Sequence, residues 1–93
     1  MQVNVNSINA QFDWMANSSS NVANVNTSDY QAIDTTISSE GKDVSANSSR
    51  SDSGTNLAKE ITDQSVISTG VEANVKAIDT QNQIYGTLLD MLA

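Results

Sequence analysis

Apolar residues lie mainly in the two end segments of the chain, and the middle has very few. Over residues 38–55 only Val44 and Ala46 are apolar. A chain with this distribution can bury apolar surface only by bringing its two ends together or by associating with copies of itself. The pattern is typical of a structural assembly protein rather than of an enzyme.

The N-terminal segment has the spacing of one face of a helix, and this predicts a helix over about residues 5–24. Steps of three and four connect Val5, Ile8, Phe12, Met15, Ser19 and Val22. Ser19 is the polar member of this series. Residues 17–21 are all asparagine or serine, whose side chains compete for backbone hydrogen bonds. The helix is therefore expected to need a partner to stay folded.

The C-terminal segment predicts a second helix of about five heptads, which at 1.5 Å per residue would span about 54 Å. Its heptad positions are Leu57, Ile61, Gln64, Ser68, Val71, Val75, Ile78, Asn82, Tyr85, Leu89 and Leu92. A second apolar set lies off this seam: Val66, Ile67, Ile84, Leu88 and Met91. One antiparallel partner helix cannot cover both sets, so the surplus apolar stripe predicts contacts with other subunits.

Polar residues and glycines interrupt the C-terminal pattern and allow two interpretations each. Gln64, Ser68 and Asn82 either fix the register of helix pairing or face solvent in a loosely packed turn. Gly70 and Gly86 each weaken a helix by about 1 kcal/mol relative to alanine. Either they permit close helix approach in an assembly, or they are tolerated on the surface.

The segment between the helices is expected to be flexible. Residues 30–37 lean towards extended structure, and residues 38–55 are serine-rich with two glycines, which is typical of a linker. The predicted fold class is all-α, with two long antiparallel helices in a coiled-coil hairpin joined by a flexible Ser-rich loop. The predicted segments are an N-terminal helix at 1–30, a linker at 31–55 and a heptad helix at 56–93.

Composition excludes several classes of function. The net charge is −7, and the four basic residues are dispersed, which argues against binding nucleic acid or an anionic membrane. The chain has no cysteine and no histidine, so disulfides and most zinc sites and nucleophile–base pairs are excluded. No apolar run approaches the roughly 20 residues of a membrane span, and no signal peptide of the Sec type is expected.

The carboxylates do not form a recognisable catalytic or calcium-binding pattern. The candidates are Glu60, Asp63, Glu72, Asp79 and Asp90, which the spacing assigns to a charged, solvated helix face. A serine–lysine dyad built from Lys59 and Ser65, or from Lys76 and a nearby threonine, has no buried site to support it. We expect no catalytic residue, no metal and no cofactor.

Residues after the first predicted helix resemble a signature of the bacterial flagellar rod and hook family of axial proteins. The family pattern is approximately Asn-x-Ala-Asn-x-x-Thr-x-Gly-Tyr, and here it is carried by Asn21, Ala23, Asn24, Thr27 and Tyr30. Asp29 stands where the family usually has glycine, and aspartate tolerates positive φ better than most residues.

The second predicted helix is similar to the family's C-terminal pattern. The residues that carry it are Leu57, Glu60, Ala73, Asn74, Ile78, Thr80, Leu88 and Leu89. Val71 stands where a tyrosine is common. Larger family members insert folded domains between the helices, so this chain resembles a minimal proximal-rod subunit.

The resemblance implies a structural subunit that assembles helically around the export channel and transmits torque for motility. It also implies export by the flagellar type III apparatus without a cleaved signal, a place in the periplasm-spanning rod, and contacts with copies of itself and other axial proteins. Under it Ala23 and Ala73 allow close helix contact, while Asn21, Asn24 and Asn74 hydrogen-bond within or between subunits.

Pattern and resemblance together define a predicted assembly interface. Its residues are Asn21, Ala23, Asn24, Thr27, Tyr30, Leu57, Ile61, Val71, Ala73, Asn74, Val75, Ile78, Tyr85, Leu88, Leu89 and Leu92. An alternative function is a coiled-coil adaptor or export chaperone that binds a flagellar or type III client through the C-terminal helix. A small hydrolase finds no support in these residues.

Overall fold

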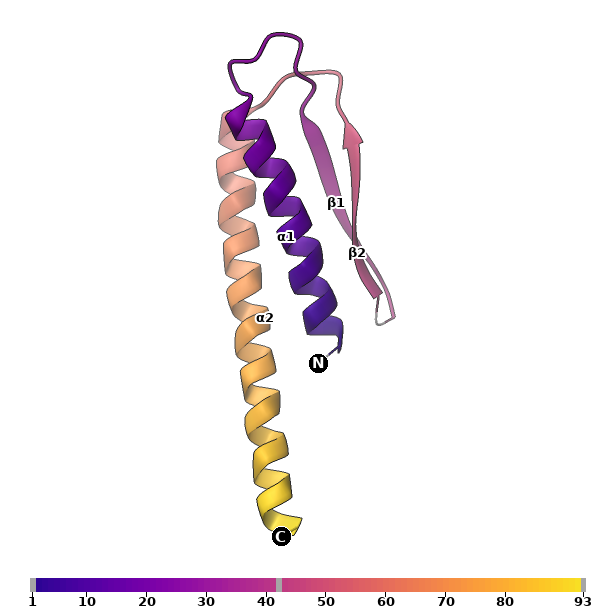
Figure 1. Ribbon diagram of the computed structural model, residues 1–93, viewed down its shortest axis with the longest axis vertical. Coiled ribbons are helices and arrows are strands. Elements are labelled where there is room, and N and C mark those ends of the chain that lie inside the picture. Colours follow the sequence, from indigo (N-terminus) through magenta and orange to yellow (C-terminus); the bar gives the residue numbers. More distant parts are fainter. Residues whose placement is uncertain (1, 42, 93) are drawn as a thin grey trace.

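The computed structural model describes residues 2–41 and 43–92, so the predicted segment ends at 1 and 93 lie outside the described residues. The order of elements is α1 (Gln2–Ala23), β1 (Ile33–Glu40), β2 (Asp43–Arg50) and α2 (Leu57–Leu92). The two helices run antiparallel, and the strands form a hairpin beside α1 (Figure 1). The molecule is elongated, with extents of 64 × 22 × 13 Å. No helix in the described ranges is both long and apolar enough to cross a membrane.

The predicted all-α class is wrong, because the Ser-rich segment forms an antiparallel β-hairpin instead of a flexible loop. The fold is therefore α+β. In the register of the hairpin, Thr35 lies opposite Ser48 and Ile37 lies opposite Ala46. Alternate positions share one face of a strand, so Ile33, Thr35 and Ile37 lie on the same face as Ala46 and Ser48.

The sequence signal for the hairpin is an alternation of apolar and polar residues that its serine content obscures. The second face is polar and combines Asp34, Thr36, Ser38 and Glu40 with the residues opposite them on β2. Gly41 begins the connection between the strands with φ of 61°, a conformation that favours glycine and that tight hairpin turns require. Serine at alternate positions is compatible with a half-exposed two-stranded sheet. The high serine content of this segment therefore does not distinguish a flexible linker from a β-hairpin.

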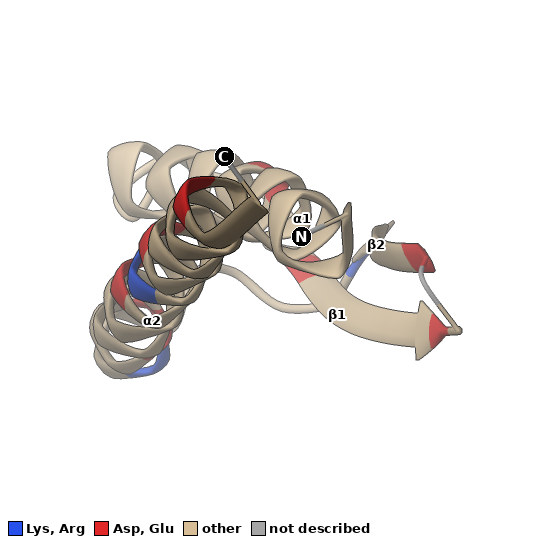
Figure 2. Ribbon diagram, turned by 90° about the horizontal axis from the view of Figure 1, so that it is seen from below, with Lys and Arg blue, Asp and Glu red and all other residues tan. Residues whose placement is uncertain are grey.

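The helix α1 is the central element because it contacts α2 on one side and both strands on another. Figure 2 shows this arrangement end-on, with α2 and the hairpin on different sides of α1. Asn17 of α1 donates from Nδ2 to Thr35 Oγ1 at 2.9 Å and to Ser48 Oγ at 2.8 Å. One side-chain amide therefore holds a cross-strand pair against the helix.

The buried core is small and half polar. The buried apolar residues are Ala10, Ala32 and Ile67, and the buried polar residues are Ser18, Asn21 and Glu60. Each large apolar side chain buried on folding contributes about 1.5–3 kcal/mol. Among these six, only Ile67 is a large apolar side chain, so hydrogen bonds have an unusually large part in holding the elements together.

Gly41 and Gly86 both have open surroundings, so substitutions there change stability through the backbone conformation and not through packing. A Cβ built at Gly41 or at Gly86 meets no atom within 4 Å. Gly41→Ala should destabilise the chain by about 1 kcal/mol, because alanine is strained in the left-handed conformation. Gly86→Ala in the exposed helix should instead stabilise it by up to about 1 kcal/mol. Urea unfolding followed by circular dichroism measures both, and shifts of the same sign would contradict the assigned backbone geometry.

Candidate assembly interface

Asn21, in the last turn of α1, connects three elements through one buried side-chain amide. Its exposed fraction is 1%. Its Oδ1 accepts from the Ile33 backbone N–H at 2.8 Å, and its Nδ2 donates to the Ile33 carbonyl at 2.9 Å. The amide thus makes the same pair of hydrogen bonds with β1 that a neighbouring strand would make. The edge of β1 is occupied at this point by a side chain.

The same asparagine also holds the start of α2. Its Nδ2 donates to Glu60 Oε1 at 2.7 Å, and its backbone carbonyl accepts from Thr55 Oγ1 at 2.6 Å. The Glu60 side chain is 4% exposed and lies in the first turn of α2, where the helix dipole favours a negative charge. A buried carboxylate is costly unless it is hydrogen-bonded, so the Asn21–Glu60 contact fixes how the two helix ends meet.

The turn that follows α1 closes back onto Asn21. Tyr30 donates from Oη to Asn21 Oδ1 at 2.9 Å, and the Ser20 hydroxyl lies 3.2 Å from Tyr30 Oη. Asn24 donates to the Ser20 carbonyl at 2.9 Å and accepts from Thr27 Oγ1 at 3.1 Å. Four of the predicted signature residues therefore form one connected hydrogen-bond cluster.

Asp29 adopts φ of 61° in this turn. That value lies in the left-handed region, which glycine enters without strain. The position where the family resemblance expects glycine is thus one where the backbone conformation favours glycine, and aspartate is among the residues that tolerate it. Arg50 lies over the ring of Tyr30 with its Cζ 5.5 Å from the ring centre, which connects the end of β2 to the same turn.

Polar side chains form hydrogen bonds between α1 and α2 at several points along the contact. Asn4 donates to Asn74 Oδ1 at 3.0 Å, and Asn74 donates to Gln11 Oε1 at 3.4 Å. Further along, Gln64 donates to Ser18 Oγ at 3.1 Å. Asn4, Gln11 and Ser18 are seven residues apart, so they form one polar column of a heptad pattern.

Gly70 leaves room for the Gln11 side chain of α1. A Cβ at Gly70 would overlap the side-chain amide of Gln11, whereas Gly86 has open space around it. The Gly70 carbonyl also accepts from Asn74 Nδ2 at 2.9 Å. Gly70 therefore lies in the helix contact within one chain, close approach of Gly70 in an assembly stays a prediction, and Gly86 lies in open surroundings.

The observed helix contact is offset by one residue from the predicted seam. On α1 the predicted seam residues Val5 and Phe12 are 42% and 56% exposed, while their neighbours Asn4 and Gln11 contact α2. An offset of one residue corresponds to a rotation of about 100° about the helix axis. On α1, polar residues therefore occupy the contact and Val5 and Phe12 are exposed, while on α2 the contact also includes the buried Ile67.

Exposed apolar side chains are consequently numerous on α2. They are Leu57, Ile61, Val66, Val75, Ile84, Tyr85, Leu88, Leu89, Met91 and Leu92. The exposed fraction is highest near the C-terminal end, where it reaches 84% at Leu92. Figure 1 shows that this end of α2 extends well past the start of α1. Monomeric soluble proteins seldom expose contiguous apolar surface of this kind.

The structure distributes the predicted interface residues over three environments. Asn21, Asn24, Thr27 and Tyr30 form the hydrogen-bond cluster, and Asn74 lies in the helix contact. Val71 and Ile78 are half-buried against α1. The exposed members are Ala23, Leu57, Ile61, Ala73, Val75, Tyr85, Leu88, Leu89 and Leu92.

Sequence reasoning missed Asn4, Gln11 and Ser18, which join the helices, and Asn17, which holds the hairpin. The assignment of Glu60 to a solvated helix face was wrong, because Glu60 is 4% exposed and accepts a hydrogen bond from Asn21. The heptad spacing of Asn4, Gln11 and Ser18 was the available signal. Of the seam interruptions, Gln64 contacts Ser18, whereas Ser68 and Asn82 are exposed.

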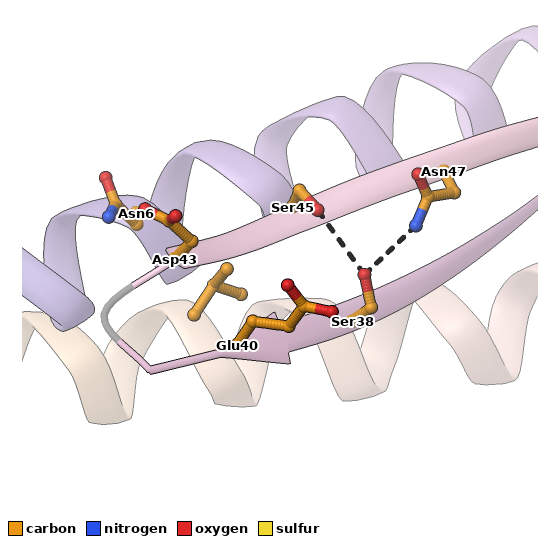
Figure 3. A pocket seen from close by; sticks show the side chains of 7 residues that line it. Asn6, Ser38, Glu40, Asp43, Ser45 and Asn47 are labelled. Atoms are coloured by element: carbon orange, nitrogen blue, oxygen red, sulfur yellow. Dashed lines mark hydrogen bonds between the residues drawn. The ribbon is translucent and has the colours of Figure 1, made fainter.

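A hollow of about 490 Å³ lies at the turn end of the hairpin. Its lining is polar except for Val44, and Figure 3 shows Ser38 hydrogen-bonded to Ser45 and Asn47 on the neighbouring strand. Glu40 and Asp43 also line it. Within residues 2–41 and 43–92, no group of three or more histidine, cysteine, aspartate or glutamate residues is placed to hold a metal ion.

The one ion pair of the described residues belongs to a solvated helix face. Lys59 Nζ donates to Asp63 Oδ2 at 2.7 Å, one helical turn away. That hydrogen bond raises the pKa of Lys59 above its ordinary value. Exposed pairs at this spacing stabilise a helix by only about 0.3–0.5 kcal/mol, so the pair has a local structural effect.

The protein is elongated, and many apolar side chains of α2 are left exposed by the described residues. In a comparison with known families, residues 49–91 match the model of the family described as flagellar basal body rod FlgEFG protein C-terminal. The matched segment runs from the last residues of β2 through nearly all of α2, slightly less than half of the chain. No curated protein and no solved structure matches.

The family match confirms the predicted resemblance over residues 49–91. It indicates a structural role related to the flagellar rod or hook, a place in the flagellar basal body, and assembly with other rod or hook proteins. The N-terminal signature around Asn21 lies outside the matched segment.

The Asn21–Glu60 contact gives a prediction with a defined pH dependence. Asn21→Asp places two carboxylates in contact and removes the donor, so the free energy of unfolding at pH 7 should fall by about 2 kcal/mol or more. Two carboxylates in contact repel each other, and protonation of one of them relieves this repulsion. Part of the loss should therefore be regained as the pH falls towards about 4.

Urea unfolding of Asn21→Asp at neutral pH and at about pH 4.5, near the ordinary carboxyl pKa, measures this effect. The matched control is Asn26→Asp, which adds the same charge on an exposed turn residue and should change stability by less than about 0.5 kcal/mol. Adding Glu60→Gln to Asn21→Asp should restore part of the stability at neutral pH, because the glutamine amide can donate to the introduced carboxylate while the hydrogen bond to the Ile33 carbonyl stays lost. Equal effects of both Asn→Asp changes would contradict the assigned role.

Proposed function

We propose that this protein is a structural subunit of the bacterial flagellar basal-body rod. In this role it assembles helically through its terminal helices around the export channel and transmits torque for motility. The observation that carries the proposal is the family match over α2, combined with the apolar side chains that α2 leaves uncovered. An axial subunit needs such surface, because most of its contacts are made with neighbouring subunits.

The polar contact between α1 and α2 supports the same role. Polar side chains hold the two helices in register within one chain, while the outward apolar residues remain free to contact other chains. Ala23 and Ala73 are exposed, so their small side chains are available for close helix contacts between subunits. The proposed interface thus combines these alanines with the exposed apolar residues of α2.

The proposal includes the route and the place of the protein in the cell. We propose export by the flagellar type III apparatus without a cleaved signal, followed by incorporation into the rod where it crosses the periplasm. Ile67 is the one large apolar side chain among the buried residues described, so the chain should unfold at low cost, which suits passage through a narrow channel. We propose no enzymatic activity and no cofactor.

A second candidate function is a coiled-coil adaptor or export chaperone that binds a flagellar or type III client through α2. The exposed apolar residues of α2 favour it as well. The two functions differ in stoichiometry. A chaperone forms a defined complex with one client, whereas a rod subunit forms open-ended assemblies.

Deletion of the gene in the bacterium that encodes the protein tests the proposed function. We expect loss of swimming and basal bodies arrested without a hook, because axial assembly is sequential and a missing rod subunit leaves no base for the next. Electron microscopy of isolated basal bodies reports the arrest, and expression of the intact gene should restore hooks. Unaffected swimming with intact hooks would contradict the proposal.

A further inference from the structure

The contact face of α2 continues beyond the end of α1. Going along α2, one heptad column that faces α1 consists of Glu60, Ile67, Asn74 and Gln81, all buried or half-buried. A second column, three to four residues away, consists of Gln64, Val71 and Ile78, which are half-buried. In a pair of packed helices, residues seven positions apart lie on the same face. Each column therefore predicts which later residues of α2 lie on the face that contacts α1.

The next members of these columns are large, apolar and exposed. They are Leu88 in the first column and Tyr85 and Leu92 in the second, with exposed fractions of 48%, 59% and 84%. The exposure rises because α1 ends: its Asn4 pairs with Asn74, and little of α1 extends further. The face therefore carries both polar and apolar residues where α1 covers it, and it is apolar at Tyr85, Leu88 and Leu92, which no other described element covers.

We call residues 82–92 the α2 overhang. At 1.5 Å per residue its length is about 16 Å. Ile84 and Met91 add to its apolar surface, with exposed fractions of 54% and 76%. Asp90 is its single charged residue. The overhang thus presents about three helical turns of nearly uncharged, apolar surface.

A second surface in the same chain matches the overhang in length and chemistry. Val5, Ile8, Phe12 and Met15 lie on the face of α1 next to the polar column, and we call them the α1 outer stripe. Val5 and Phe12 are 42% and 56% exposed, and Ile8 and Met15 are half-buried. From Val5 to Met15 the stripe spans about 15 Å. Asp13 is the single charged residue of α1.

We propose that the α2 overhang of one copy binds the α1 outer stripe of a second copy. The inference rests on the proposed assembly role and names the two surfaces that meet. Continuity with the α1–α2 contact supports a helix as the occupant, because the overhang extends a face that already packs against a helix. Equal length and the near absence of charge on both sides support a second copy of this chain.

The two surfaces are different patches of one chain, so the contact is head-to-tail. A head-to-tail contact propagates into an open filament unless its rotation closes a ring. The net charge of −7 on each copy opposes association, and salt screens that repulsion. Assembly through an apolar contact should therefore strengthen as ionic strength rises.

Single-cysteine variants test this contact directly, because the natural chain has no cysteine. Phe12→Cys and Leu88→Cys alter exposed side chains. The two variants are mixed in equal amounts as full chains under assembly conditions and then oxidised. We expect a disulfide-linked dimer that contains one chain of each variant. Ser49→Cys, on the polar face of the hairpin, replaces Phe12→Cys in the control mixture and should yield no such dimer.

Sedimentation of the unmodified chain, alone and with other rod proteins, accompanies the cross-linking. Linkage of Phe12→Cys to Leu88→Cys supports the proposal. Filaments without that linkage, or Leu88→Cys chains that link to each other equally well, would overturn this pairing and leave the proposed function standing. No assembly under any condition would overturn both.

Leu88→Asp gives an independent result, with Asn82→Asp as the control that adds the same charge elsewhere on the overhang. Leu88→Asp should abolish sedimentation while the circular dichroism spectrum of the monomer stays unchanged. Asn82→Asp should sediment as the natural chain does. Loss of sedimentation in both variants would show that added charge alone blocks assembly and would overturn the specific role of Leu88.

Discussion

Hydrogen bonds between polar side chains fix the contact between α1 and α2, in which Ile67 is the one large apolar side chain that is fully buried, and the rest of the structure depends on this. Asn4, Gln11 and Ser18 pair across the helices, and Asn21 pairs with Glu60 at the end where the helices meet. Hydrogen bonds need defined partners, so they fix the register of the two helices more strictly than apolar contacts do. They also leave the apolar side chains on outer faces, where other chains can cover them.

Asn21 shows what a residue of low helix propensity contributes in the last turn of α1. Asparagine in a helix competes with the backbone, and residues 17–21 predict a marginal helix for that reason. The structure uses the same side chains between elements: Asn17 holds the hairpin, Ser18 contacts α2, Ser20 lies beside Tyr30, and Asn21 joins β1 and α2. Residues that weaken α1 as an isolated helix therefore stabilise its position in the fold.

The sequence predicts the two helices and their antiparallel order, because apolar residues at steps of three and four extend over several turns of each. It does not predict which of two neighbouring faces makes the contact. Val5 and Phe12 form a better apolar seam than Asn4 and Gln11, and the expectation that apolar residues lie inside selected the wrong face. The hairpin was missed for a related reason: Ile33, Ile37 and Ala46 alternate with polar residues, and the serine content of the segment suggested a linker. In both cases the prediction followed the residue types and overlooked the regular spacing of the polar residues.

The central claim is that a single chain buries little apolar surface, and the heat capacity change on unfolding measures that quantity most directly. A typical globular chain of this length would have a heat capacity change of about 1.1–1.4 kcal/mol/K. Calorimetry of the dilute monomer should give a value clearly below this range, because polar groups make the helix contact. A value within or above the range would show that the monomer buries an ordinary apolar core, and would contradict the account.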